Sequence, residues 1–223
     1  MELRAENSVL SCCLSGDAEG LQRVLESKSN SDEGETVDLL SEKDDVGRNA
    51  LFMACMLGRS NVVRELVKYG GNVNELTARG YSPLHCAAVW GQLDTVKTLV
   101  DLGADMHTVN FRGEKAKEVA CRYSKTDCAE FLAWAEAKQD LQSYISQVRQ
   151  TISDPEKVHG KLTKEEKNIC MNTCSAKADW IQNAKNPSKQ DFIEQKQHLE
   201  DTISPVLAKL TLQSEATAKH RKN

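Results

Sequence analysis

No stretch of this 223-residue sequence approaches the ~20 consecutive apolar residues that cross a bilayer, so no membrane span is expected. The N-terminal residues MELRAE carry acids and no apolar segment, so a secretory signal is not expected either. No glycine-rich loop has the spacing and the lysine of a phosphate-binding motif. No thiol or hydroxyl lies in a pattern with a base and an orienting group. These absences predict a chain that is not an enzyme and that needs no cofactor.

Aromatic residues are scarce, at 5% of the chain, and the net charge of −4 is unevenly distributed. Residues from 138 onward hold 14 basic and 11 acidic side chains, whereas the residues before them hold 15 and 22. The acidic N-terminal part disfavours a nucleic-acid partner, because phosphate binding needs a basic surface. The change in charge near residue 137 indicates a border between two units.

Glycine recurs at a fixed interval, since Gly47, Gly80 and Gly113 lie 33 residues apart. After Gly80 one apolar helical face ends at Gly91 and a second ends at Gly103. A unit of this length cannot bury its own apolar face and must stack on copies of itself. The interval therefore predicts an all-α stack of helix pairs, which is a surface suited to holding another molecule.

The segment GYSPLHCAA at residues 80–88 resembles the signature of the ankyrin repeat family, and GADMH at 103–107 resembles its hairpin. The resemblance covers residues 5–137 and implies four repeats, of which the outer two are degenerate end units: 5–46, 47–79, 80–112 and 113–136. In the fourth repeat Lys117 and Ser124 replace the usual leucine and the central glycine. The polar stretch 27–35 is expected to be an exposed loop between the first two repeats.

The same resemblance implies that a partner is contacted around each starting glycine and just before each central glycine. The candidate binding residues at these places are Arg48, Met56, Arg79, Tyr81, Val89, Trp90, Phe111 and Arg112, with Asp45, Val46, Leu57, Ala78 and Glu114 beside them. Tryptophan, tyrosine and arginine are enriched at binding hot spots, so the set predicts one concave patch for a protein or peptide. The alternative is that Trp90 packs against the next repeat and the arginines are ordinary solvated charges.

Histidine and cysteine offer little chemistry in this sequence. The resemblance implies that His85 has a structural role in which it bonds to neighbouring turns. The cysteines of the repeats are expected on the core faces of short helices, where the thiol acts as a small apolar group: Cys12, Cys13, Cys55, Cys86, Cys121 and Cys128. Cys170 and Cys174 lie one helical turn apart, but zinc usually takes four ligands, so a buried helix face is favoured over a metal site. All eight cysteines are expected to be reduced.

After residue 137 the pattern changes to three amphipathic helices. The first ends before Asp154, the second begins at Thr163 with a capping box to Glu166, and the third follows the break at 186–188. Pro205 is expected to kink the third helix or to end its regular part.

The order of residues in 138–212 resembles the helical lid of the seventy-kilodalton heat-shock chaperones. The parallel segments are LQSY at 141–144, GKLT at 160–163, WI at 180–181, FIEQKQHLE at 192–200 and SPV at 204–206. The ATPase and peptide-holding domains of those chaperones have no counterpart in this chain. The resemblance therefore implies a small three-helix bundle, followed by a basic tail at 213–223, and no ATP hydrolysis.

The function expected from these patterns is that of a protein-interaction adaptor or scaffold, which grips one or more proteins or peptides on the ankyrin concave face. The alternative is a co-chaperone or regulator whose lid-like bundle acts on a heat-shock chaperone. The expected compartment is the cytoplasm, with the nucleus, the centrosome and the cilium left open. No metal site and no catalytic residue are predicted.

Overall fold

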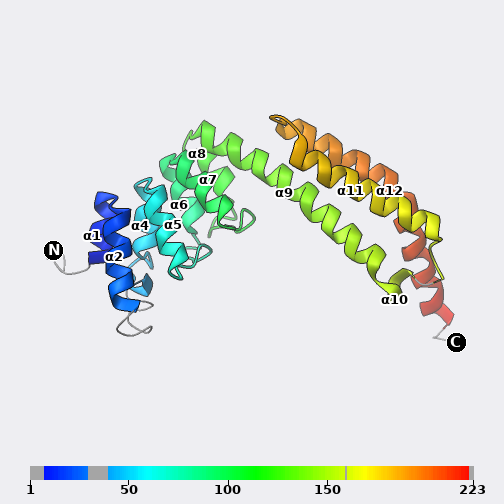
Figure 1. Ribbon diagram of the computed structural model, residues 1–223, viewed down its shortest axis with the longest axis horizontal. Coiled ribbons are helices and arrows are strands. Elements are labelled where there is room, and N and C mark those ends of the chain that lie inside the picture. Colours follow the sequence, from blue (N-terminus) through cyan, green and yellow to red (C-terminus); the bar gives the residue numbers. More distant parts are fainter. Residues whose placement is uncertain (1–7, 30–39, 159, 221–223) are drawn as a thin grey trace. The chain divides into compact units, whose positions relative to one another are not determined.

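The computed structural model describes residues 8–29, 40–158 and 160–220, which form helices and connecting turns without a strand. The chain divides into two compact units, Met1–Ala133 and Trp134–Asn223. The expected all-α fold is confirmed, with stacked helix pairs in the first unit and a helical bundle in the second (Figure 1).

Four helix pairs make up the described part of the first unit. The first helices of the pairs are α1 (Ser8–Ser15), α4 (Ala50–Met56), α6 (Pro83–Trp90) and α8 (Ala116–Arg122). The second helices are α2 (Ala18–Ser29), α5 (Ser60–Lys68), α7 (Leu93–Asp101) and the start of α9 (Thr126–Ser153). Consecutive first helices contact one another, and so do α2, α5 and α7, so the pairs form a stack with two layers of helices (Figure 1).

Small side chains at equivalent positions allow the first helices to approach closely. Ala54, Ala87 and Ala120 are fully buried. The fourth pair keeps this geometry with a less suitable sequence, because Ser124 takes the place of a glycine. Its φ of 56° lies in the left-handed region that Gly91 occupies at 71°. A non-glycine residue there carries strain, which the surrounding helix pair must offset.

Residues 27–29 of the expected loop belong to α2, and 30–39, which include the remainder of that loop, lie outside the described residues. The expectation that Cys121 faces the core is wrong, since its side chain is exposed, while Cys13, Cys55 and Cys128 are buried. Cys121 is the next-to-last residue of the seven-residue α8 and lies on the side of that helix turned away from the stack.

The second unit is a bundle of α9, α11 (Lys164–Asn183) and α12 (Lys189–His220), with the short α10 (Pro155–Val158) between the first two. The core includes Leu141 and Ile145 from α9, Cys174 from α11, and Phe192 and Leu199 from α12. The capping box expected at the start of α11 is present, because the Glu166 backbone N–H donates to the Thr163 hydroxyl and the Glu166 carboxylate accepts from the Thr163 N–H.

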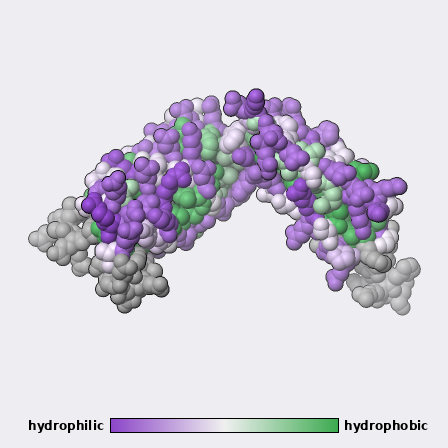
Figure 2. All heavy atoms as spheres, viewed as in Figure 1, coloured by the Kyte–Doolittle hydropathy of each residue, from purple (hydrophilic) through white to green (hydrophobic). Residues whose placement is uncertain are grey.

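Two of these helices run further than their sequence signals indicate. α9 continues without interruption from the fourth repeat into the bundle, since 126–153 contains neither glycine nor proline. α12 continues through Pro205 to His220, so the proline does not end the helix. Among the described helices none combines the length and the apolar character that a bilayer span requires. The surface in view is mostly hydrophilic, with apolar residues gathered in patches on each unit (Figure 2).

Candidate partner-binding surface

The turns that connect the helix pairs are built by the same hydrogen bonds in three successive repeats. The backbone N–H groups of Asp44, Thr77 and Asn110 donate to the carbonyl oxygens of Arg48, Tyr81 and Glu114 at 2.9, 2.9 and 3.0 Å. Each turn includes a starting glycine in the left-handed region. A Cβ on Gly80 would lie 3.3 Å from the Asn110 Cα, so close contact between turns also favours glycine here.

Hydrogen bonds also join the tips of neighbouring turns. The Ala78 N–H donates to the Val46 carbonyl at 3.4 Å, and the Phe111 N–H donates to the Arg79 carbonyl at 3.0 Å. The two bonds are equivalent, because donor and acceptor each move by one repeat. The tips therefore form a row in which the side chains of successive repeats lie next to one another.

Four of the eight candidate residues meet at these tips. The Arg79 guanidinium lies 5.7 Å from the centre of the Phe111 ring, and that of Arg112 lies 5.4 Å from it. The ring of Tyr81 lies 6.2 Å from the same ring, at 44° to it. We call Arg79, Tyr81, Phe111 and Arg112 the arginine–aromatic cluster. Phe111 is 57% exposed, so the cluster is accessible from solvent.

The other four candidates lie apart from this cluster. Arg48 makes an ion pair with Asp44 at 2.7 Å, and its Nη1 is 4.0 Å from the Met56 Sδ. Val89 is half-buried near the end of α6, and Trp90, the last residue of that helix, is 56% exposed. Among the described residues no ring or cation contact joins Trp90 to the arginine–aromatic cluster. More than half of its surface is therefore available to a partner.

Sequence reasoning missed Arg122 and Tyr123, which extend the surface into the fourth repeat. They lie 33 residues after Val89 and Trp90, so the interval itself could have found them. The Arg122 guanidinium lies 4.7 Å from the centre of the Tyr123 ring, and its Nε is 2.8 Å from the Glu114 carboxylate. Ser124 in place of the central glycine obscured the equivalence.

Hydrogen bonds keep Glu114 and Arg122 charged at the end of the surface that the fourth repeat forms. Donation from the Asn110 amide, followed by donation from Arg122, lowers the pKa of Glu114 below its ordinary value. Bonding to Glu114, with further bonds to Tyr123 and Tyr81, raises the pKa of Arg122. Glu114 and Arg122 are therefore an ionised pair within the fourth repeat, and the bond from Arg122 to Tyr81 joins this repeat to the arginine–aromatic cluster.

His85 connects two repeats beneath the surface, and its exposed fraction is 1%. The Ser82 backbone N–H donates to its Nδ1 at 3.2 Å, so Nδ1 is an acceptor and the ring proton is on Nε2. Nε2 donates to the Glu114 carbonyl at 3.0 Å. Burial lowers the pKa of His85, which keeps the ring neutral, and these contacts are those of a structural residue.

The buried thiols of the repeats are poor nucleophiles. Burial raises the pKa of Cys13 and of Cys86 to about 12, the opposite of the shift that a nucleophilic thiolate needs. Burial also raises the pKa of Cys170 and Cys174. Within the described part of the chain no three histidine, cysteine or acidic side chains are grouped as metal ligands.

The comparisons agree with this geometry. The family model described as "Ankyrin repeats (3 copies)" matches residues 10–110. "Ankyrin repeat domain-containing protein 45" of Danio rerio is 62% identical over 224 residues, which cover 100% of both chains.

The chain belongs to the ankyrin repeat family. The proteins of the same name from Homo sapiens and Mus musculus are 47% and 49% identical over 210 residues, or 94% of this chain and 79% and 85% of theirs. Ankyrin repeats are generally interaction modules, so this assignment implies protein partners. The match to the ankyrin family model ends before the fourth helix pair and the bundle. The alignment with the Danio rerio protein includes both.

Proposed function

We propose that this chain is a non-enzymatic adaptor that binds a protein or peptide on the concave face of its ankyrin stack. The arginine–aromatic cluster carries the proposal, because two guanidinium groups lie over one exposed ring. Neither Arg79 nor Arg112 makes an ion pair within the described residues, whereas Arg48 and Arg122 are paired with Asp44 and Glu114. Guanidinium groups that make no ion pair and lie beside an exposed ring suit a partner that presents carboxylates and an apolar side chain.

The surface is already in place before a partner arrives. The turn-to-turn hydrogen bonds hold the backbone of Arg79 and Phe111, and Tyr81 packs edge-on against buried His85 at 5.7 Å. Binding then costs little ordering entropy, and more of the contact energy is available as affinity. Eight free cysteines support the cytoplasm as the place where such a scaffold acts.

Replacing Arg79 and Phe111 together with alanine is expected to weaken partner binding at least tenfold. Truncating a hot-spot residue typically costs 2 kcal/mol or more, and about 1.4 kcal/mol corresponds to tenfold. Trp90→Ala is a second variant on the same face. Proximity labelling in cells would identify partners that the native chain enriches, and calorimetry with each purified partner would measure the loss.

A matched control uses a cation–aromatic pair that lies away from the turns, on the second helices of the third and fourth pairs. Lys97 of α7 lies 6.0 Å from the ring of Phe131 in α9, so Lys97→Ala with Phe131→Ala removes the same types of group elsewhere. Partner binding should survive this change. Equal binding by both double variants, with the native circular dichroism spectrum retained, would show that the arginine–aromatic cluster is not the binding surface.

The alternative proposal is a regulator of heat-shock chaperones that acts through the second unit. The three-helix bundle built by α9, α11 and α12 is the feature that supports it, since a chaperone lid is also a helical bundle. Adding the full chain to a seventy-kilodalton chaperone is then expected to change its rates of ATP hydrolysis and client release. Rates that are constant across chain concentrations would exclude this role.

A further inference from the structure

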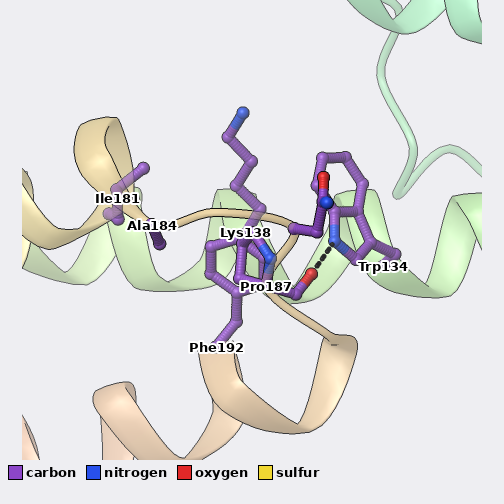
Figure 3. Close-up of a pocket in the computed structure, with 7 residues that line it drawn as sticks. Trp134, Lys138, Ile181, Ala184, Pro187 and Phe192 are labelled. Atoms are coloured by element: carbon purple, nitrogen blue, oxygen red, sulfur yellow. Dashed lines mark hydrogen bonds between the residues drawn. The ribbon is translucent and has the colours of Figure 1, made fainter.

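A cavity opens in the second unit where α11 turns into α12. Its volume is about 470 Å³, within the range of ligand sites. The lining residues are Trp134, Lys138, Ile181, Ala184, Asn186, Pro187 and Phe192. Figure 3 shows that Trp134 and Lys138 come from α9, whereas Pro187 comes from the turn and Phe192 from the start of α12.

The walls of this cavity are held by contacts that do not depend on a ligand. The Trp134 Nε1–H donates to the Pro187 carbonyl at 2.9 Å, which ties the turn to α9 (Figure 3). The rings of Trp134 and Trp180 each meet Phe192 edge-on, at 5.7 and 5.4 Å. Asn186 has a φ of 51°, a left-handed conformation that these contacts keep in place. The cavity is therefore preformed.

Lys138 is the charged residue of the lining, and its Nζ lies 5.3 Å from the centre of the Trp134 ring. Lys138 makes no ion pair within the part of the chain that is described. Lys185 and Lys189 border the turn on either side and are exposed. The nearby Asp191 carboxylate accepts hydrogen bonds from the Ser188 N–H and hydroxyl and so caps α12. The charge beside the cavity therefore favours a carboxylate.

The partial exposure of the lining residues indicates which kind of occupant suits the cavity, a free small ligand or one side chain of a larger molecule. Phe192, at 1% exposed, is the one buried residue of the lining, and the other lining residues keep part of their surface in solvent. A small-molecule site usually buries 70–90% of the surface of its ligand. A cavity with so exposed a lining buries less. A peptide side chain fits better, because the rest of the peptide lies outside.

We propose that this cavity binds an aromatic side chain that a partner peptide carries next to a carboxylate. The ring packs between Trp134, Ile181 and Phe192, and the carboxylate pairs with Lys138. This site is separate from the ankyrin surface of the proposed function. The chain would thus have a second recognition site, for short acidic aromatic segments.

Fluorine NMR of the full chain tests this proposal, because the chain has three tryptophans. With 5-fluorotryptophan incorporated, the signals of Trp90, Trp134 and Trp180 are assigned by single Trp→Phe changes. The probes are capped peptides Gly-Phe-Glu-Glu-Gly, Gly-Phe-Lys-Lys-Gly and Gly-Ala-Glu-Glu-Gly. We expect the first to shift the Trp134 signal saturably while the Trp90 signal stays constant, and to bind at least threefold tighter than the other two.

Two variants test the contacts. Lys138→Gln should weaken the acidic peptide about threefold, the size of effect for a partly exposed ion pair. Ala184→Phe should fill the cavity and abolish the shift. Lys164→Gln is the control, because Lys164 begins α11 and lies at the opposite end of that helix from Ala184. A shift of Trp90 alone would place the peptide on the ankyrin surface.

Three results would overturn the proposal: no saturable Trp134 shift, equal affinity for the acidic and basic peptides, or unchanged binding by the Ala184→Phe variant. Octanoate serves as a free apolar carboxylate. Octanoate that binds as tightly as the acidic peptide would show a small-molecule site and would also contradict the peptide as occupant. Each of these readouts is independent of whether the arginine–aromatic cluster binds its own partner.

Discussion

Phe192→Ala is expected to lower the free energy of unfolding of the second unit by about 4 kcal/mol, the usual cost of truncating a buried phenylalanine. The ring is 1% exposed and contacts the rings of both Trp134 and Trp180. Its loss removes apolar contact and leaves a cavity between α9, α11 and α12. Urea unfolding of the full chain, followed by circular dichroism and tryptophan fluorescence, measures the change.

Ile193→Ala is the matched control, because Ile193 is the next residue of α12 and is 42% exposed. Surface substitutions of this type usually change stability by less than about 0.5 kcal/mol. The two tryptophans of the bundle should report the early transition of the Phe192 variant, while Trp90 reports the ankyrin unit. Equal losses from the two variants would show that Phe192 does not fill the core as described.

His85→Ala is expected to cost the ankyrin unit about 3 kcal/mol. The change leaves a cavity and removes the partner of the Ser82 N–H, and a buried polar group without a partner costs about 1–3 kcal/mol. The Glu114 carbonyl loses one of its two donors and keeps the Asn110 N–H. Because the bond to Glu114 joins two repeats, the loss should also reduce cooperativity between them. Thermal unfolding measured at 222 nm tests this, with exposed His198→Ala as the control.

His85 also makes the stability of the folded chain depend on pH. The pKa of His85 in the folded chain lies below its ordinary value of 6.5, so the unfolded state binds more protons as the pH falls below that value. The contribution of His85 to stability is complete above pH 6.5 and is lost as the pH falls through the lowered pKa. His85→Ala should therefore flatten the stability profile below pH 6.5, and an unchanged slope would contradict this account.

Much of the ankyrin unit is predictable because its signals are local. The interval between Gly47, Gly80 and Gly113 reflects a turn that needs left-handed backbone, and the small Ala54, Ala87 and Ala120 reflect close helix packing. The capping box of Thr163 and Glu166 is equally local, since both partners lie within one helical turn.

The prediction of the binding surface was less complete, because it depended on which side chains meet across repeats. The family resemblance implied that Tyr81, Phe111 and the arginines lie on one face, but it did not predict that two guanidinium groups lie over the Phe111 ring. Arg122 and Tyr123 were missed since a serine replaced the glycine that marks the register. Whether the eight candidate residues bind a partner stays a prediction.

The sequence by itself determined the family, the helix pairs and the caps of this protein, because each depends on residues close together in the chain or at a fixed interval. Only the tertiary structure decided which arginines are paired, that Cys121 is exposed, and that Trp134, Lys138 and Phe192 surround one cavity. Trp134 and Pro187 lie 53 residues apart, and their contact arises from the packing of helices in space. No local pattern encodes such a contact, so the cavity is a property of the folded bundle alone.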